Sequence, residues 1–199
     1  MARRSEHSQE QIREMVLNAA EAIVIEKGLN ALTVRKVAVE IGYTVGSIYM
    51  VFANMQDLIM HIKLRTLDQL TEQLTLDTSE SAEQQIQALA NHYLAFAQQH
   101  FNRWQIMFES NLDNKIELPE TYQTKIEQLF SPLESLFQQL NPQAPAEQVN
   151  LIARALWSGV HGICVLYLNG SLGRVGVENA ESAVKLLVDT VIRGWRQTA

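Results

Sequence analysis

The sequence predicts an all-α protein of about nine helices, and three observations support that prediction. Apolar residues recur at the three- and four-residue spacing of an amphipathic helix along most of the 199 residues. Nine glycines and four prolines, the prolines all from Pro119 onward, supply few of the turns that an all-β fold needs. Hydrophobic residues make up 47% and charged residues 19%, a composition typical of globular rather than disordered chains. The length suits one domain with a substantial core, or two smaller domains.

The first expected helix lies between Ser8 and Gly28. Ser8 and Gln11 have the spacing of a capping box, in which each side chain accepts a hydrogen bond from a free backbone N–H at the helix start. Gly28 suits the position just after a helix end, where a left-handed backbone is common. One face of this helix is apolar, with Ile12, Met15, Val16, Ala19, Ala20 and Ile23. The pattern predicts a helix that buries one side.

Two short helices joined by a tight turn are expected next. Thr33 is an N-cap candidate for the first of them, and Gly42 ends it. Thr44 is an N-cap candidate for the second, whose apolar residues include Ile48 and Phe52. Two helices of about eight residues joined by a turn that contains glycine are typical of a helix-turn-helix.

Six further helices are expected downstream. Asn54, with Asp57 three residues later, can cap the first of them. Pro132 interrupts a later helical stripe, which predicts either a kink or a new helix start near Ser131. Pro145 suits the first turn of the helix after that. In chain order the six cover approximately Asn54 to Leu74, Ile86 to Ala97, Trp104 to Ser110, Tyr122 to Leu140, Pro145 to Tyr167 and Glu178 to Trp195.

Charge is divided unevenly along the chain. The formal net charge is −6 at pH 7. Residues 1–65 carry eight Lys or Arg against seven Asp or Glu, a net charge of +1, so the rest of the chain carries −7. We therefore expect a polyanion to meet the N-terminal segment rather than the acidic remainder.

The expected helix-turn-helix defines candidate contacts to DNA. The second helix of such a unit enters the major groove, and residues near its N-terminus read base edges. Hydroxyl groups reach phosphate oxygens, Val45 offers an apolar surface to a thymine methyl, and Gly46 permits close backbone approach. The alternative is that the two threonines only cap their helices. The candidate contact residues are Arg3, Arg4, Thr33, Arg35, Lys36, Thr44, Val45, Gly46, Ser47, Tyr49 and Met50.

The same stretch resembles the DNA-binding domain of TetR-type transcriptional regulators. The resemblance rests on Thr33-Val34-Arg35-Lys36-Val37-Ala38, Gly42, Gly46-Ser47-Ile48-Tyr49, Phe52 and Asp57-Leu58. It implies an all-helical homodimer, without enzymatic activity, that binds a palindromic operator. It also implies a helix-turn-helix domain at residues 1–53 and a helical ligand-binding and dimerisation domain at residues 54–199. A small molecule entering the second domain would release the DNA.

Three positions depart from the family pattern. Met50 and Val51 stand where an aromatic residue or a His-Tyr pair is common in the family. Met55 stands where a phosphate-contacting Lys is frequent. These residues remove polar and cationic contacts, so they are expected to affect DNA affinity more than the fold.

Aromatic and soft apolar side chains in the second half of the chain could line a cavity for a small apolar or amphipathic effector. The histidine among them would add a polar group. The alternative is that all of them are ordinary core residues, with the histidine hydrogen-bonded to a neighbour. The candidate ligand-pocket residues are Tyr93, Phe96, Trp104, Met107, Phe108, Trp157 and His161.

The last two expected helices carry wide apolar faces, more than one partner helix would cover. Such a helix pair predicts an interface between two copies of the chain. In the first of these helices, the segment from Trp157 to Gly162 resembles the Trp-His-Gly signature of one C-terminal subclass of the family, where the helix serves in dimerisation. The candidate interface residues are Leu156, Val160, Tyr167, Leu187, Val191 and Trp195.

Catalytic, metal and membrane functions are not expected. Ser158 and His161 share a helix, but the Gly-x-Ser-x-Gly pattern of an activated serine is absent. The five histidines show no i, i+4 pair and Cys164 is the single cysteine, so neither a metal site nor another cofactor is implied. The longest apolar run, Ile163–Leu168, is far shorter than the roughly 20 residues that span a bilayer.

We therefore expect a ligand-responsive transcriptional regulator that acts as a repressor. Its expected location is the cytoplasm, because no leader sequence or disulfide framework is evident. Its expected partners are a double-stranded DNA operator, a second copy of the chain and a small-molecule effector. The alternative is a helical protein-binding adaptor without sequence-specific DNA binding, which the weak basic charge of residues 1–65 leaves open.

Overall fold

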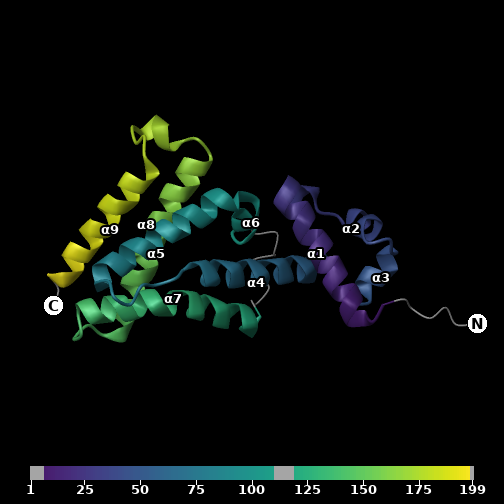
Figure 1. Ribbon diagram of the computed structural model, residues 1–199, viewed down its shortest axis with the longest axis horizontal. Helices are drawn as coiled ribbons and strands as arrows, with labels where there is room; N and C mark the ends of the chain where they lie inside the picture. Colours follow the sequence, from purple (N-terminus) through teal and green to yellow (C-terminus); the bar gives the residue numbers. More distant parts are fainter. Residues whose placement is uncertain (1–6, 110–118, 198–199) are drawn as a thin grey trace, which may run out of the picture. The chain divides into compact units, whose positions relative to one another are not determined.

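The computed structural model describes residues 7–109 and 119–197, and the regular structure within these ranges is entirely helical (Figure 1). Nine α-helices and two short 3-10 helices make up this described part of the chain. The predicted all-α class and the predicted number of helices are both confirmed.

Packing divides the described residues into two compact units. Unit 1 comprises residues 7–66 and 100–109, and unit 2 comprises residues 67–99 and 119–197. Helix α4 (Met55–Gln73) contributes to both units, because the division falls after Thr66. The division that the sequence predicts, after residue 53, lies just before α4 begins at Met55 and stays a prediction.

Helix α1 (Gln9–Lys27) has the caps that the sequence predicts. The Ser8 hydroxyl accepts a hydrogen bond from the Gln11 backbone N–H at 3.2 Å, and the Gln11 side chain accepts one from the Ser8 N–H at 2.8 Å. These bonds satisfy two of the backbone donors that a helix start leaves free. At the other end Gly28 has φ 76°, a backbone conformation in which a Cβ atom is strained, and a 3-10 helix (Leu29–Ala31) follows.

The predicted helix-turn-helix is formed by α2 (Val34–Glu40) and α3 (Val45–Tyr49). The Thr33 hydroxyl caps α2 by accepting from the Lys36 N–H at 3.3 Å, and the Thr44 hydroxyl caps α3 by accepting from the Ser47 N–H at 3.2 Å. Gly42 has φ 71° in the turn between the helices, which a residue with a Cβ would adopt only with strain.

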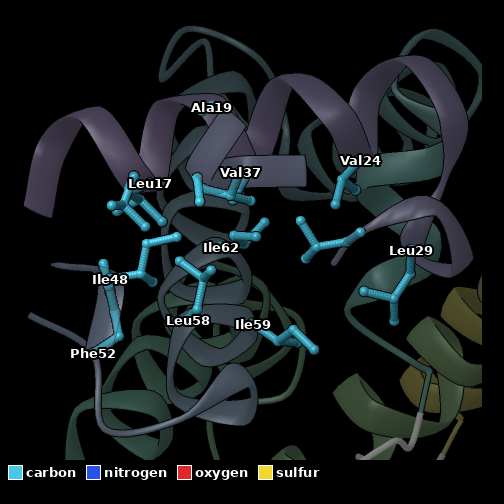
Figure 2. Packing of buried hydrophobic residues seen from close by; sticks show 14 of the residues in the cluster. Leu17, Ala19, Val24, Leu29, Val37, Ile48, Phe52, Leu58, Ile59 and Ile62 are labelled. Carbon is cyan, nitrogen blue, oxygen red and sulfur yellow. The ribbon is translucent and has the colours of Figure 1, made fainter. Parts of the chain in front are cut away.

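The core of unit 1 is a continuous apolar cluster from α1, α2, α3 and α4, with one residue from α6 (Phe101–Ile106). Figure 2 shows Val37, Ile48, Leu58 and Ile62 of this cluster meeting beneath α1. Helix α4 begins as predicted, because the Asn54 side chain accepts from the backbone N–H three residues later at 2.9 Å. The cluster holds the two short helices, which would not be stable in isolation.

Unit 2 is a bundle of α5 (Ala82–Gln99), α7 (Glu120–Leu140), α8 (Ala146–Leu168) and α9 (Ala180–Arg196), with the end of α4. Helix α5 packs against the other three, and a 3-10 helix (Leu172–Val175) lies between α8 and α9. Helix α7 continues through Pro132, so the alternative of a new helix near Ser131 is excluded. The Trp195 indole N–H donates to the Phe137 carbonyl at 2.9 Å and fixes α9 on α7.

Helix α8 is long and apolar enough, by length and composition alone, to cross a bilayer. The uninterrupted apolar run Ile163–Leu168 covers only the end of this helix. Scattered polar residues interrupt the rest, but the helix as a whole remains apolar. Only 22% of the apolar window is buried within one chain. A single helix of this kind is weak evidence for a membrane, because helices of soluble proteins that pack on partners have the same composition. Much of the apolar surface of α8 is therefore exposed within one chain.

Candidate nucleic-acid interface and ligand cavity

The second helix of the helix-turn-helix presents one face outward and buries the other. Ile48 and Phe52 lie in the core of unit 1, at 1% and 2% exposure. Tyr49 is 48% exposed and Met50 is 68% exposed. Both side chains are therefore available for contact with a partner at this surface. The orientation expected from the sequence is thus present, with the two anchors below and the predicted contact residues above.

The remaining predicted DNA contacts also lie at the surface. Thr33, Arg35, Lys36, Thr44 and Gly46 are exposed, and Val45 and Ser47 are half-buried. Thr33 and Thr44 do cap their helices, and because they stay exposed this role does not prevent a contact to phosphate. The Ser47 hydroxyl lies 3.0 Å from the Thr44 hydroxyl, and the Lys36 ammonium donates to the Ala31 carbonyl at 2.9 Å. Arg3 and Arg4 lie outside the described residues.

A guanidinium from α1 holds the end of the helix-turn-helix. Arg13 donates to the Val51 carbonyl at 2.7 Å and stacks over the Phe52 ring, with its Cζ 4.5 Å from the ring centroid. Its other terminal nitrogen lies 2.5 Å from Nε2 of His61 on α4. Nothing in the spacing of the sequence singles out Arg13 or His61, because they meet Val51 and each other across 38 and 48 residues.

His61 fits this role as a neutral acceptor. Burial lowers the pKa of His61, the charge of Arg13 lowers it further, and Asp57 at 3.4 Å partly opposes both. A neutral imidazole has one nitrogen that accepts a hydrogen bond, so Nε2 can receive the Arg13 N–H. Arg13 and His61 therefore form a hydrogen-bonded link between α1 and α4 beneath the helix-turn-helix.

A second ionic link ties α1 to α4 and α6 within unit 1. Arg65 donates to Glu14 at 2.5 Å and to Glu21 at 3.1 Å, and it also donates to Asn18 at 2.7 Å. Arg103 of α6 lies 3.5 Å from the other oxygen of the Glu21 carboxylate. Glu21 is largely buried, where a charge pair is screened less than at the surface. The network couples α6 to the helix that supports the helix-turn-helix.

Unit 2 contains a partly open cavity of about 50 Å³ lined by α5, α7 and α8, with Leu74 just after α4. Two of the predicted ligand-pocket residues, Tyr93 and Trp157, line it. A third, His161, lies beside them: its Nδ1 is 2.9 Å from the Tyr93 hydroxyl and its ring stacks on the Trp157 ring at 5.2 Å. The other lining residues are Leu156 and Val160, which the sequence suggests for the dimer interface, and seven that it marks only as helical stripes: Leu74, Ile86, Leu89, Ala90, Leu129, Phe130 and Leu133.

The other predicted pocket residues do not line this cavity. Phe96 is fully buried in unit 2. Trp104 and Met107 are buried in unit 1, and Phe108 packs against Trp104 there with ring centroids 5.3 Å apart. His100 separates the end of α5 from the start of α6, and α6 packs on α1. Aromatic content alone could not separate the two environments.

The predicted dimer-interface residues fall into two groups. Leu156, Val160 and Trp195 are buried within one chain, and the first two line the cavity. Tyr167 is exposed, and Leu187 and Val191 are half-buried. The most exposed apolar side chains of α8 and α9 are Leu151 and Leu186, at 68% and 69%. The sequence does not single them out, because strict helical spacing marks the inner stripe of a helix and not the outer one.

Other reactive groups have structural roles. The Ser158 hydroxyl donates to the Arg154 carbonyl one turn earlier at 2.7 Å, so it does not face His161 as a nucleophile would. Burial raises the pKa of the Cys164 thiol to about 12, which leaves it unreactive. Among the residues that the structure describes, no three His, Cys, Asp or Glu side chains are grouped as metal ligands.

Comparisons with known proteins define the class. Residues 16–62 match the family described as bacterial regulatory proteins, tetR family. Residues 86–191 match the family described as tetracyclin repressor-like, C-terminal domain. The chain therefore belongs to the TetR family of transcriptional regulators, which are DNA-binding proteins and not enzymes.

Solved structures share the fold over nearly the whole chain. A Rhodococcus sp. RHA1 protein of unknown function superposes with a TM-score of 0.75 at 20% identity, covering 96% of this chain and 98% of that one. A tetR-family transcriptional regulator from Streptomyces coelicolor gives 0.71 at 13% identity, covering 97% and 85%. A TetR transcriptional regulator from Rhodococcus sp. RHA1 gives 0.62 at 16% identity, covering 92% and 97%. No curated protein matched the chain. At these identities the structures establish the fold alone.

Proposed function

We propose that this regulator binds a palindromic operator as a homodimer and acts as a repressor that a small molecule releases from DNA. One observation carries the DNA-binding part: the second helix of the helix-turn-helix and the turn after it bury Ile48 and Phe52 while exposing Tyr49 and Met50. A helix that presents side chains in this way fits the major groove of DNA. The contact residues proposed are those named from the sequence, Arg3 and Arg4 included.

Dimerisation is supported by the apolar surface that one chain leaves exposed on α8 and α9. Two copies would place their helix-turn-helix units on half-sites about 34–36 Å apart, or a multiple of that distance. Tyr167, Leu187 and Val191 of the predicted set, with Leu151 and Leu186, supply accessible or half-buried apolar side chains for such a four-helix contact. The Trp-His-Gly subclass, the domain division after residue 53 and a cytoplasmic location belong to the same proposal.

Release requires an effector that binds one geometry of the dimer better than another, since equal binding to both shifts nothing. The cavity among α5, α7 and α8 is the proposed site for a small apolar or amphipathic effector, because its lining is largely apolar. Glu21, Arg65 and Arg103 offer a physical connection inside unit 1 from α6 to α1.

The test is fluorescence anisotropy at low salt with duplexes that tile the region upstream of the protein's own gene. A random duplex of equal length is the comparison. We expect one segment to bind at least about 1,000-fold more tightly than random DNA, the lower end of specific recognition. Equal and weak binding of all duplexes would refute the operator and favour the adaptor. Sedimentation of the free protein would show a dimer.

A further inference from the structure

We propose that the cavity of unit 2 takes an uncharged aromatic molecule of one or two rings. This inference rests on the proposed function and specifies the chemistry of its effector. Three observations carry it: the absence of charge in the cavity wall, the arrangement of three aromatic rings, and the small size of the cavity.

No Lys, Arg, Asp or Glu is among the described residues that line the cavity. Arg154 stacks over Phe130, a ring of the wall, but its charge is already paired, because it bonds to Glu134 at 2.5 Å. His161 beside the cavity has its pKa lowered by burial and is neutral at pH 7. An ionised ligand would lose its hydration without gaining a counter-charge, so the site excludes carboxylates and ammonium groups.

Aromatic side chains enter the wall from each of the three enclosing helices: Tyr93 from α5, Phe130 from α7 and Trp157 from α8. The Trp157 ring meets Tyr93 at 73° and Phe130 at 78°, with centroid distances of 6.3 Å and 5.6 Å. These edge-to-face contacts are the geometry that aromatic pairs prefer. A flat ring between them would continue the same pattern of edges and faces, which a flexible alkyl chain would not.

The cavity measures about 50 Å³, whereas an apolar cavity that holds benzene measures about 150 Å³. A ring held wholly inside the cavity therefore requires α5, α7, α8 or their side chains to move apart. The ligand must bind a more open arrangement of these helices than the one described, and this difference in affinity is the condition for a switch. Size thus links occupation of the cavity to a change in the bundle.

The test compares 1-naphthol, 1-naphthoate and protonated 1-naphthylmethylamine, three two-ring probes that differ in charge. Calorimetric titration of the full-length protein at pH 7.5 should give saturable binding of 1-naphthol. Both charged probes should bind at least about tenfold more weakly. Such a difference would shift the pKa of a bound ionisable probe by about one unit toward its uncharged form. Tight binding of a charged probe, or no binding of 1-naphthol, overturns the proposal.

Location is tested by filling the cavity. Ala90 lines it on α5, whereas Ala88 is half-buried on the same helix and lies outside the lining. We expect Ala90→Leu to weaken 1-naphthol binding by at least about tenfold and Ala88→Leu to leave it unchanged. Should Ala90→Leu lose its helical circular dichroism, Leu133→Phe fills the cavity from α7. Full affinity in a folded cavity-filled variant overturns the proposal.

The two proposals fail separately. A protein that binds its operator but prefers charged probes keeps the regulatory function and loses the uncharged aromatic effector. A protein that binds 1-naphthol in the cavity but no specific DNA keeps the ligand class and loses the operator. If both hold, 1-naphthol should lower operator affinity in the wild type and leave it unchanged in Ala90→Leu.

Discussion

Arg13 donates a 2.7 Å hydrogen bond to the Val51 carbonyl and so joins the first helix to the turn that follows the exposed helix of the helix-turn-helix. The carbonyl lies where the chain leaves α3 and turns toward α4. The same guanidinium covers Phe52 and touches His61. Arg13 therefore holds the turn just after α3 in place. The way α3 is presented to DNA depends on that turn.

Arg13→Ala should destabilise the fold and weaken DNA binding together. The Val51 carbonyl and the His61 nitrogen would lose their donor, and an unsatisfied partly buried group costs about 1–3 kcal/mol. We expect that loss in the free energy of unfolding from urea titration, with operator affinity lower by about tenfold. Arg174→Ala removes an exposed arginine of unit 2 and should change neither. Unchanged operator affinity in a destabilised Arg13→Ala protein would show that the contact serves the fold alone.

Stability should fall on mild acidification because of His61. Its pKa is lowered from 6.5 in the folded protein, chiefly by burial, so below pH 6.5 the unfolded chain binds the proton more readily. The contribution of His61 to the free energy of unfolding is fully present above pH 6.5. It is lost as the pH falls from 6.5 through the lowered pKa of the folded protein. His100 and His161 shift in the same direction through burial, so His61 is one of three contributors.

The measurement is urea unfolding at several values between pH 7.5 and pH 5 for the wild type and His61→Gln. Glutamine keeps a hydrogen-bond acceptor for Arg13 and does not titrate in this range. The variant should lose less stability than the wild type as the pH falls. Parallel curves for the two proteins would exclude His61 as a source of the pH dependence.

The sequence predicts the local features of the fold well, because they depend on residues close together in the chain. Ser8 with Gln11, and Thr44 with Ser47, satisfy free helix donors three residues apart, so composition and spacing suffice to find them. The direction of Tyr49 follows from the apolar period that buries its neighbour Ile48. These predictions need no knowledge of how distant helices pack.

Contacts between distant segments could not be predicted in the same way. Tyr93 and His161 are 68 residues apart, and their hydrogen bond depends on how α5 and α8 pack. Trp104 is as aromatic as Trp157, yet one lies in unit 1 and the other lines the cavity of unit 2. Periodicity shows which face of a helix is buried but does not show which helix covers it.

Two substitutions in the helix-turn-helix should separate positioning from base recognition. Tyr49→Phe removes a hydroxyl that would donate to phosphate, so binding to all duplexes should weaken by a similar factor, about threefold to tenfold. Val45→Ala removes apolar surface that would meet a thymine methyl, so preference at one base pair should relax while other positions keep theirs. Anisotropy on a set of single-base operator variants measures both. The proposed docking of α3 would be contradicted if Tyr49→Phe changed the preference at one base pair and Val45→Ala weakened binding to all duplexes.

Gly159 should be the glycine of α8 that resists substitution. A Cβ atom there would lie 2.7 Å from Cδ2 of Leu187, so the side chain of α9 must shift to admit it. Gly162 lies on the same helix with nothing within 4 Å of its Cβ position, and alanine there should gain helix propensity of about 0.5–1 kcal/mol. Gly159→Ala gains the same propensity, but it must displace the end of the half-buried Leu187 side chain, which offsets part or all of that gain. Urea unfolding at fixed protein concentration should therefore rank Gly162→Ala above the wild type and Gly159→Ala below Gly162→Ala. Equal stability of the two variants would mean that α8 and α9 do not approach each other closely at Gly159 in solution.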